Sequence, residues 1–130
     1  MKESARTKCL RAFQRLRVYQ ESCGGYAKCI SCGRVLPVSQ LDGGHYIGRR
    51  HTSTELEPDN VQPQCRKCNR FLAGDAVAYR IGLVKKIGEK RVERLESLLE
   101  SNDSKRKTSK EYDELARKYR KELRELQKNS

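Results

Sequence analysis

The sequence predicts a small α+β domain that depends on a bound metal ion for its fold, preceded by a helix and followed by a helical extension. Three observations carry this prediction: two CxxC motifs, short apolar runs between turn residues around them, and helical spacing of apolar residues at both ends. The chain has 130 residues, of which 35% are hydrophobic and 35% charged. A chain of this size and composition forms one domain with a small core, so a second stabilising device is expected.

Residues 1–25 are expected to form an amphipathic N-terminal helix. Apolar residues recur there at intervals of three and four, which places them on one face of a helix, while the basic residues lie largely off that line. Gly24 and Gly25 mark the end of the helix. The apolar line consists of Ala5, Cys9, Ala12, Leu16 and Tyr19.

Residues 26–82 form a turn-rich middle zone that contains both histidines and all three prolines. Its short apolar runs, RVLPV at 34–38 and GHYIG at 44–48, are typical of strands and suit a small β-hairpin. Helical spacing returns after Cys68. We therefore expect strands followed by a helix in this zone.

Residues 83–130 have the pattern of charged helices. Two amphipathic helices are expected, the second beginning at a capping-box motif formed by Thr108 and Glu111. The pattern leaves three roles open: a DNA-binding arm, a dimerising pair or hairpin of helices, or a solvated extension with few core contacts. The apolar positions are Val92, Leu95 and Leu99 in the first helix and Tyr112, Leu115, Tyr119, Leu123 and Leu126 in the second.

The cysteines indicate a structural zinc site. Two thiolates on a tight CxxC turn supply one edge of a tetrahedron, and a second such turn completes it. The alternative is two unrelated pairs of thiols. Of the remaining cysteines, Cys9 is expected to be a small buried hydrophobe, and Cys23 is surplus. The predicted Zn²⁺ ligands are Cys29, Cys32, Cys65 and Cys68.

The environment of the protein follows from its charge and from its lack of long apolar runs. No segment resembles a signal peptide or approaches the roughly 18 apolar residues of a membrane span, so a reducing cytoplasm is expected. The net charge is +12, from 29 Lys and Arg against 17 Asp and Glu. This surplus favours a nucleic acid partner. A membrane surface is the alternative, but no segment has the strongly apolar face that it requires.

The segment between the CxxC motifs, with the residue after them, contains side chains suited to phosphodiester hydrolysis. His45 follows Gly43 and Gly44, which allow a phosphate to approach closely, and a neutral imidazole can take a proton from water. Asp42 and the carboxamide of Asn69 offer the oxygen ligands that Mg²⁺ or Mn²⁺ prefers. We therefore expect His45, Asp42 and Asn69 to surround one catalytic metal site.

These motifs resemble those of the NinG or Rap family of lambdoid-phage recombination endonucleases. The matching stretches are CISCGR, LDGGHYIGRRH and EPDNVQPQCRKCNRFLAGD, and the resemblance covers most of the chain. The order of the residues is also similar to that in HNH or His-Me-finger nucleases, including phage endonuclease VII. The resemblance implies a zinc-stapled ββα-metal core. It also implies a metal-dependent endonuclease that cuts branched DNA, such as Holliday junctions or D-loops, in the cytoplasm of the bacterial host.

The resemblance implies a role for each site residue. His45 would be the general base, Asn60 would hold the loop that carries the base, and Asn69 would bind the catalytic metal. In the common HNH arrangement the metal ligand immediately precedes the base, whereas Gly44 occupies that position here. Asp42 is therefore either a metal ligand or a turn cap, and Asn60 could also be a turn residue.

Basic side chains near the motifs are expected to contact DNA phosphates without reading bases, although one of them, His51, could instead have a turn role. Symmetric cutting of a four-way junction needs two cuts, so a homodimer is expected. The alternative to an enzyme is a non-catalytic zinc module that binds recombination intermediates or a partner protein. A site-specific homing or restriction enzyme would need a base-reading element, for which the chain has little room. The predicted DNA contacts are Arg49, Arg50, His51, Arg66, Lys67 and Arg70.

Overall fold

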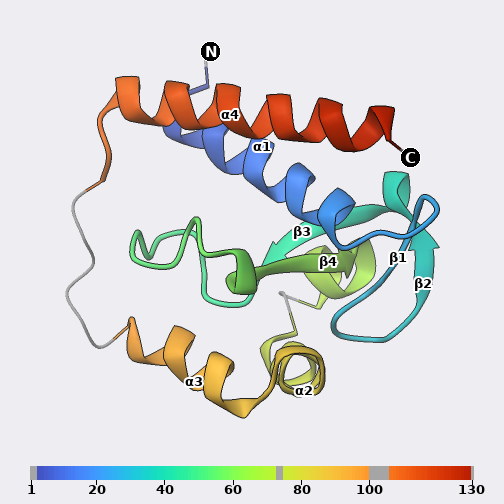
Figure 1. Cartoon of the computed structure of the whole chain (residues 1–130). Helices are drawn as coiled ribbons and strands as arrows, with labels where there is room; N and C mark the ends of the chain where they lie inside the picture. The colour runs from blue at the N-terminus through green and yellow to red at the C-terminus, as the bar shows by residue number, and fades with distance from the viewer. Residues whose placement is uncertain (1–2, 73–74, 100–105, 130) are drawn as a thin grey trace.

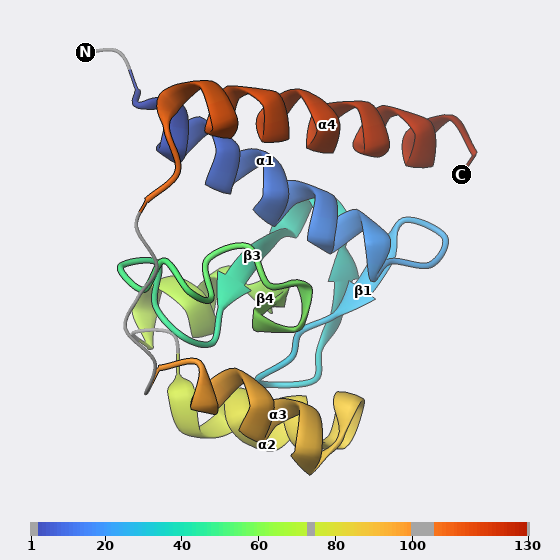
Figure 2. The same ribbon diagram turned by 60° about the vertical axis from the view of Figure 1, so that its left-hand side comes forward.

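The computed structural model describes residues 3–72, 75–99 and 106–129, and within them the predicted mix of helices and small sheets is confirmed. The helices are α1 (Ala5–Gln20), α2 (Ala76–Ile87), α3 (Glu89–Ser97) and α4 (Ser109–Lys128). The strands are β1 (Tyr26–Lys28), β2 (Val35–Pro37), β3 (Leu41–His45) and β4 (Val61–Cys65). Short helical turns are η1 (Val38–Gln40), η2 (Pro58–Asn60) and the π-helical η3 (Lys67–Phe71). The β3–β4 hairpin lies between two helical layers, with α1 and α4 on one side and α2 and α3 on the other (Figures 1 and 2).

Helix α1 forms where the N-terminal pattern predicts it. Ser4 caps it by accepting a hydrogen bond from the backbone N–H of Thr7 at 3.1 Å. The helix ends at Gln20, before Gly24 and Gly25, whose positive φ angles turn the chain. Its buried surface is wider than the predicted stripe, because α4 covers one side of it and the hairpin the other. The buried residues are Cys9, Leu10, Phe13, Leu16, Arg17 and Val18.

The predicted pairing of the two apolar runs is wrong. RVLPV contains β2, which pairs antiparallel with β1, whereas GHYIG begins at the end of β3, which pairs antiparallel with β4. The β1–β2 hairpin surrounds the first CxxC motif, and β4 ends at Cys65, the first residue of the second. Each run thus pairs with a strand beside a cysteine motif, because the two motifs must meet for the sulfurs to cluster.

Many of the buried apolar side chains of the described residues group into three small clusters. The first lies around the cysteines, the second between α2, α3 and the neighbouring loops, and the third between α1 and α4. This division agrees with the small core expected from the composition. The first cluster contains Val18, Ala27, Leu41, Cys29, Cys65 and Cys68; the second Ile30, Ile47, Tyr79, Leu83, Val92 and Leu95; the third Cys9, Tyr112 and Ala116.

The C-terminal helices do not form a hairpin with each other. Helix α3 packs on α2, and α4 returns to lie along α1 in the same direction (Figures 1 and 2). The predicted capping box is confirmed, with Thr108 and Glu111 each accepting from the other's backbone N–H. The Tyr119 ring lies 5.0 Å from that of Phe13. Helix α4 is therefore part of the fold rather than a solvated extension, and the boundary drawn after residue 82 falls inside α2. Most of the segment between the two C-terminal helices lies outside the described residues.

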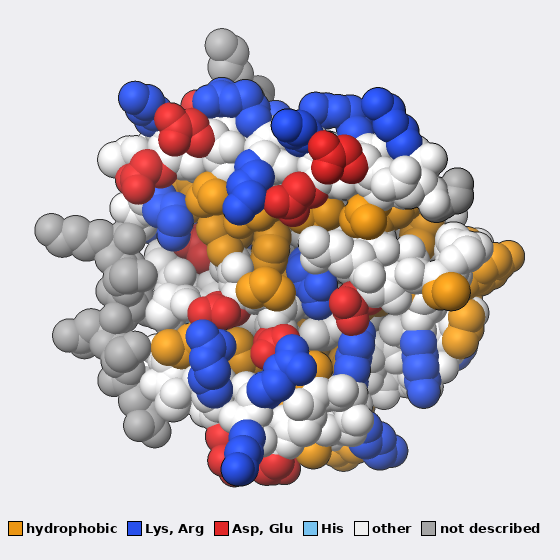
Figure 3. Space-filling view, in the orientation of Figure 1, with side chains coloured by type: hydrophobic (Ala, Val, Ile, Leu, Met, Phe, Trp, Pro, Cys, Tyr) orange, Lys and Arg blue, Asp and Glu red, His pale blue; other side chains and the backbone are white. Residues whose placement is uncertain are grey.

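Charged side chains of both signs lie on the face of the molecule drawn in Figure 3. On the face drawn in Figure 3, Lys and Arg are scattered among Asp and Glu, including along α4. Within the described ranges, no helix combines the length and apolar character that a membrane span requires.

Candidate zinc cluster and histidine site

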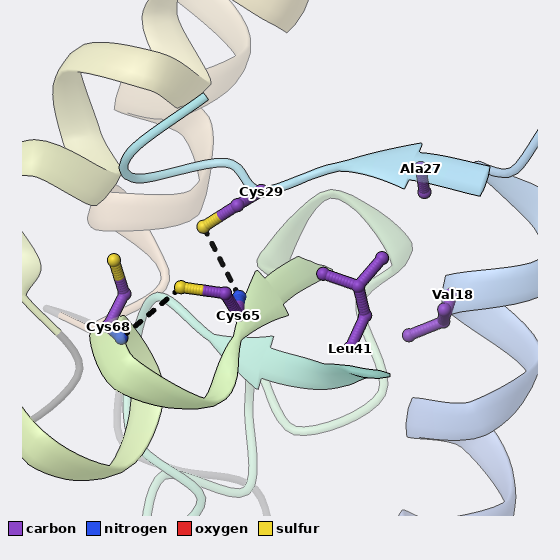
Figure 4. Close-up of a cluster of buried hydrophobic side chains, with 6 residues drawn as sticks. All are labelled: Val18, Ala27, Cys29, Leu41, Cys65 and Cys68. Carbon is purple, nitrogen blue, oxygen red and sulfur yellow. Dashed lines mark hydrogen bonds between the residues drawn. The ribbon is translucent and has the colours of Figure 1, made fainter. Parts of the chain in front are cut away.

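The four predicted cysteine ligands come together at the ends of two hairpins. Their sulfur atoms all lie within 4.8 Å of one another. A tetrahedral zinc with Zn–S bonds of about 2.3 Å places sulfurs roughly 3.8 Å apart, and the Cys32 and Cys65 Sγ atoms are separated by 3.8 Å. Backbone N–H groups of Cys65 and Cys68 point at cluster sulfurs (Figure 4). The cluster could therefore hold one zinc ion, and the alternative of two unrelated thiol pairs is excluded.

The other two cysteines stand apart from this cluster. Cys9 is completely buried in α1, as predicted for a small hydrophobe, and Cys23 is exposed. In the first CxxC turn, Gly33 adopts a φ of +79°, which favours glycine, and its N–H donates to the Cys29 carbonyl at 2.9 Å. This is the tight turn that the CxxC spacing predicts.

His45 ends β3 and is held by a backbone group. Its Nε2 lies 2.9 Å from the backbone carbonyl oxygen of Glu55. Because a carbonyl only accepts, Nε2 carries the proton and Nδ1 keeps its lone pair. Nδ1 is buried and has no hydrogen-bond partner within the part of the chain that the structure describes. The ring therefore presents an unsatisfied acceptor.

The surroundings of His45 keep its ring neutral. Burial lowers the pKa of His45 to about 4. The hydrogen bond to Glu55 acts in the opposite direction, while the positive charges of Arg49 and Arg6 lower the pKa further. At pH 7 the imidazole is therefore unprotonated at Nδ1 and able to accept a proton.

Asn60 is fully buried and holds the loop that follows His45. Its Oδ1 accepts from the backbone N–H of Ile47 at 2.8 Å, and its Nδ2 donates to the carbonyls of Ile47 and Thr54 at 3.0 Å. Thr54 is adjacent to Glu55, the partner of His45. Asn60 therefore connects the two ends of this loop through its side-chain amide.

Asp42 and Asn69 lie together, as expected, but Asp42 is also paired with arginine. Asn69 Nδ2 donates to Asp42 Oδ2 at 3.0 Å. Arg70 donates to both carboxylate oxygens at 3.0 Å, and Arg66 Nε lies 3.8 Å from Oδ1. In this arrangement Asp42 and Asn69 do not fit a divalent cation. The guanidinium groups of Arg70 and Arg66 already neutralise the Asp42 carboxylate, and their positive charges would repel a metal ion.

His45 and Asp42 lie on opposite faces of the β3–β4 hairpin. Side chains alternate along a strand, and the unbroken register from Leu41 to His45 places residues three apart on different faces. A Cβ added to Gly43 would lie 2.8 Å from the Cα of Gln14 in α1, so the His45 face is the α1 face. In the contacts described, His45 is thus held by Glu55 on one face of the hairpin, and Asp42 is held by Asn69 and Arg70 on the other.

The predicted DNA contacts form two groups. Arg49 and Arg50 are exposed and His51 is half-buried in the loop after β3, where the Arg49 carbonyl accepts from Arg6. The other three are exposed beside the second cysteine motif, where two of them pair with Asp42. One group therefore follows His45, and the other surrounds the Asp42–Asn69 pair. The second group consists of Arg66, Lys67 and Arg70.

Two further residues of the site were missed by sequence reasoning. Tyr79 is fully buried in α2 and bridges the hairpin, donating to the Gly44 carbonyl at 2.7 Å and accepting from the Gln62 N–H at 3.1 Å. Burial raises its pKa, so the hydroxyl remains a donor at physiological pH. Glu55 is also buried and supplies the carbonyl that holds His45. Tyr79 sits on the apolar spacing of its helix, which indicates burial but not these hydrogen bonds, and Glu55 lies in a polar loop with no signal.

Comparisons with known proteins agree on one group of relatives. The family model described as Bacteriophage Lambda NinG protein matches residues 3–129. Protein ninG of Escherichia phage 933W is 34% identical over 102 residues, and that of Escherichia phage lambda 33% identical over 102 residues. Each match covers 75% of this chain and 47% of the relative, so the chain spans about half the length of these curated relatives. Protein ninG of Enterobacteria phage H19B is 37% identical over 73 residues, covering 53% of this chain and 34% of the relative. No solved structure matches the chain at a significant level.

Proposed function

The chain belongs to the NinG family of lambdoid phage proteins, and from this premise we propose that it is a DNA endonuclease of phage recombination that cuts branched DNA with His45 as its general base. The branched substrate and the HNH-type ββα core come from the resemblance stated above. Support from the geometry comes from the β3–β4 hairpin followed by η3, and from the buried Asn60 behind the loop of the base. The net charge of +12 suits a DNA partner.

The state of His45 is the observation that carries the proposal. Its Nε2–H is donated to the Glu55 carbonyl, and Nδ1 is an unprotonated acceptor without a described partner. In hydrolysis, Nδ1 would take a proton from the attacking water. The water oxygen would bond to phosphorus while the bond to the 3′ oxygen breaks, which leaves a 5′-phosphate and a 3′ oxygen that takes up a proton to become a hydroxyl.

The pH dependence of cleavage should report this histidine. The pKa of His45 in the free protein is about 4, and the negative charge of a DNA phosphate near the ring would raise it. Because kcat/KM reports the free enzyme and kcat the complex, we expect the acid limb of kcat/KM near pH 4 and that of kcat at higher pH. Rates on a synthetic junction across this pH range measure both limbs. Acid limbs of kcat/KM and kcat at the same pH would contradict the assignment of His45 as the general base.

The proposed Mg²⁺ or Mn²⁺ dependence would need a rearrangement at Asp42. Asn69 and Asp42 supply oxygen atoms of the kind that such ions prefer. Arg70 would first have to leave the Asp42 carboxylate, to which it now donates twice at 3.0 Å. A DNA phosphate is an alternative partner that could draw this guanidinium away.

A non-catalytic zinc module that binds recombination intermediates is the second candidate. The observation that favours it is the separation of His45 from the Asp42–Asn69 pair across the hairpin. With the pair bound to Arg70 and Nδ1 buried, the domain could serve binding alone. Zinc and a basic surface are enough for that function.

Cleavage of a synthetic four-way junction beside a linear duplex of the same sequence separates the two candidates. The zinc-loaded chain would be assayed with Mg²⁺ and with Mn²⁺, together with its binding to both DNAs. His45→Ala tests the base, and His51→Ala is the matched control, because it removes the other histidine of the chain. We expect junction cleavage by the unchanged chain and by His51→Ala at saturating DNA, and none by His45→Ala. The unchanged chain and His45→Ala should bind the junction equally.

Two outcomes would contradict the enzyme proposal. Cleavage by His45→Ala at the normal rate would remove the proposed base. Junction binding without cleavage under either ion would favour the non-catalytic module.

A homodimer is proposed for paired cuts on a four-way junction. The apolar face of α4 packs on α1 within the chain, so that face is not available for a partner copy. Small-angle scattering of the chain alone and with a junction would measure the stoichiometry. A single copy on the junction would argue against paired cutting by this chain.

A further inference from the structure

Glu55 has a buried carboxylate that joins three parts of the molecule. Only 1% of the residue is exposed. Arg6 in α1 donates from Nε to Oε2 at 3.1 Å, and the hydroxyl of Tyr112 in α4 donates to Oε1 at 2.8 Å. The backbone carbonyl of Glu55 accepts the Nε2–H of His45 at 2.9 Å. One residue thus connects both terminal helices to the histidine.

We propose that Glu55 couples the C-terminal helix α4 to His45. Tyr112 and Arg6 fix the Glu55 segment through its carboxylate, and that segment fixes the imidazole through its carbonyl. The catalytic meaning of this coupling rests on the proposed function, in which Nδ1 acts as the base. Glu55, Tyr112 and Arg6 are positioning residues, because they act on the proposed base through another group.

The burial of the carboxylate makes this coupling strong. A charged group removed from water is stable only with hydrogen-bonded partners, and losing one partner leaves the other groups unsatisfied. The Glu55 segment would then move toward water to solvate its carboxylate. Because the carbonyl belongs to the same residue, the Nε2–H bond of His45 would weaken with it.

The groups around the network favour the arrangement described. Arg6 from α1 and Arg49 from the loop face His45 and, with burial, keep its ring neutral. Burial, together with the Glu55 carboxylate, raises the pKa of Tyr112, so its hydroxyl remains a donor. Burial raises the pKa of Cys9, in the same cluster, to about 11, so this thiol stays uncharged. Arg6 is therefore the cation that balances the carboxylate.

Tyr112→Phe is the direct test, because it removes only the hydroxyl that Glu55 accepts and keeps the ring that fills the cluster. Tyr119→Phe is the matched control. It removes the same atom from the same helix, and the Tyr119 ring packs on Phe13. The readout is NMR of ¹⁵N-labelled histidine in the zinc-loaded whole chain. With only two histidines, a His51→Ala spectrum assigns the signals of His45.

We expect Tyr112→Phe to speed exchange of the His45 Nε2 proton about tenfold, as for loss of one buried hydrogen bond. The measured pKa of His45 should fall, because the hydrogen bond to the Glu55 carbonyl is the contact that favours the protonated ring. Junction cleavage should fall about tenfold at unchanged binding, as when a supporting partner of a site residue is removed. Tyr119→Phe should change none of these quantities.

Unchanged proton exchange and an unchanged His45 pKa in a folded Tyr112→Phe protein would overturn the coupling. If that variant does not fold, Glu55→Gln, which removes the charge that Arg6 balances, carries the same measurement with the same criterion. The NMR readout does not depend on cleavage. An NMR result that contradicts the coupling therefore does not contradict the proposed function. Conversely, cleavage by His45→Ala would contradict the role of His45 as the base but not the coupling of Glu55 to its ring.

Discussion

His45 and the residues that hold it depend mostly on backbone groups. The ring donates to a carbonyl, and Asn60 exchanges hydrogen bonds with the backbone of Ile47 and Thr54. Such contacts fix the path of the loop after β3 independently of its side chains. The surroundings of His45 thus depend on a loop that the buried amide of Asn60 and the contacts of Glu55 hold in place.

The stability of the protein should fall in acid partly because of His45. The folded-state pKa of His45, about 4, lies below its ordinary value of 6.5, so the unfolded chain binds the proton more readily. The contribution is fully present above pH 6.5 and is lost as the pH falls toward 4, on the order of 3 kcal/mol in all. Urea unfolding of zinc-loaded protein across this range should be less pH-dependent in His45→Gln. An equal change in His51→Gln would show that the effect is not specific to His45.

Replacing Asn60 should destabilise the loop that follows His45. Asn60→Ala leaves one buried N–H and two carbonyls without their partner, which should lower the free energy of unfolding by about 2–4 kcal/mol. Asn69→Ala is the comparison, because Asn69 is only half-buried and donates to an Asp42 that keeps its arginine partners. Denaturant unfolding measures both variants. Equal losses would contradict the role assigned to Asn60.

At the scale of elements, the β3–β4 hairpin is shaped by contact with its neighbours on both faces. The α1 backbone lies directly over Gly43, and the Gln64 side chain lies against Gly44. Tyr79 from α2 then ties the two strands together through Gly44 and Gln62. The glycines therefore serve close packing of the hairpin, and the α1 backbone and the Gln64 side chain occupy the space that the sequence interpretation left for a phosphate.

Gly43→Ala should destabilise the protein, because the added Cβ would lie 2.4 Å from the backbone oxygen of Gln14, which cannot move without shifting α1. We expect a loss of about 1–3 kcal/mol, typical of overpacking. Gly48→Ala is the control, since nothing lies within 4 Å of its added Cβ. Thermal unfolding measures the stability of both variants. Equal unfolding midpoints for Gly43→Ala and Gly48→Ala would contradict the close approach of α1 to Gly43.

At the scale of the whole molecule, the described residues form three small apolar clusters, of which one contains Cys29, Cys65 and Cys68 and another lies where α4 packs on α1 (Figure 1). None of these clusters contains residues from all the described elements. The two hairpins carry sulfur ligands from sequence positions far apart, so a bound ion would link them directly. In such domains much of the free energy of metal binding is free energy of folding.

Removal of zinc should therefore unfold the protein. We expect purified protein to contain one zinc per chain, and Cys65→Ser to lose the metal and the cooperative unfolding transition. Cys23→Ser should keep both, because Cys23 is exposed and lies outside the cluster. Metal analysis and circular dichroism before and after chelation measure these properties. A chelated protein with unchanged structure would show that the apolar clusters suffice.

The sequence by itself determined the parts that depend on local pattern. The N-terminal helix, the capping box at Thr108 and the grouping of the four cysteines follow from spacing, because helix periodicity and chelation by a tight turn act over a few residues. The sequence also determined the family, because the motifs that identify it are short and contiguous.

The tertiary structure alone decided which strands pair, where α4 packs and what surrounds His45. RVLPV and GHYIG each pair with a segment that no local pattern marked as a strand, and the partners of Glu55 come from both ends of the chain. The alternation of side chains along a strand is a general rule, but it applies to Asp42 and His45 only if both lie in one unbroken strand. The structure shows that strand, β3, and so places the two residues on opposite faces. Such contacts join residues far apart in the chain. Their energies depend on burial and mutual geometry, which residue type and spacing do not specify.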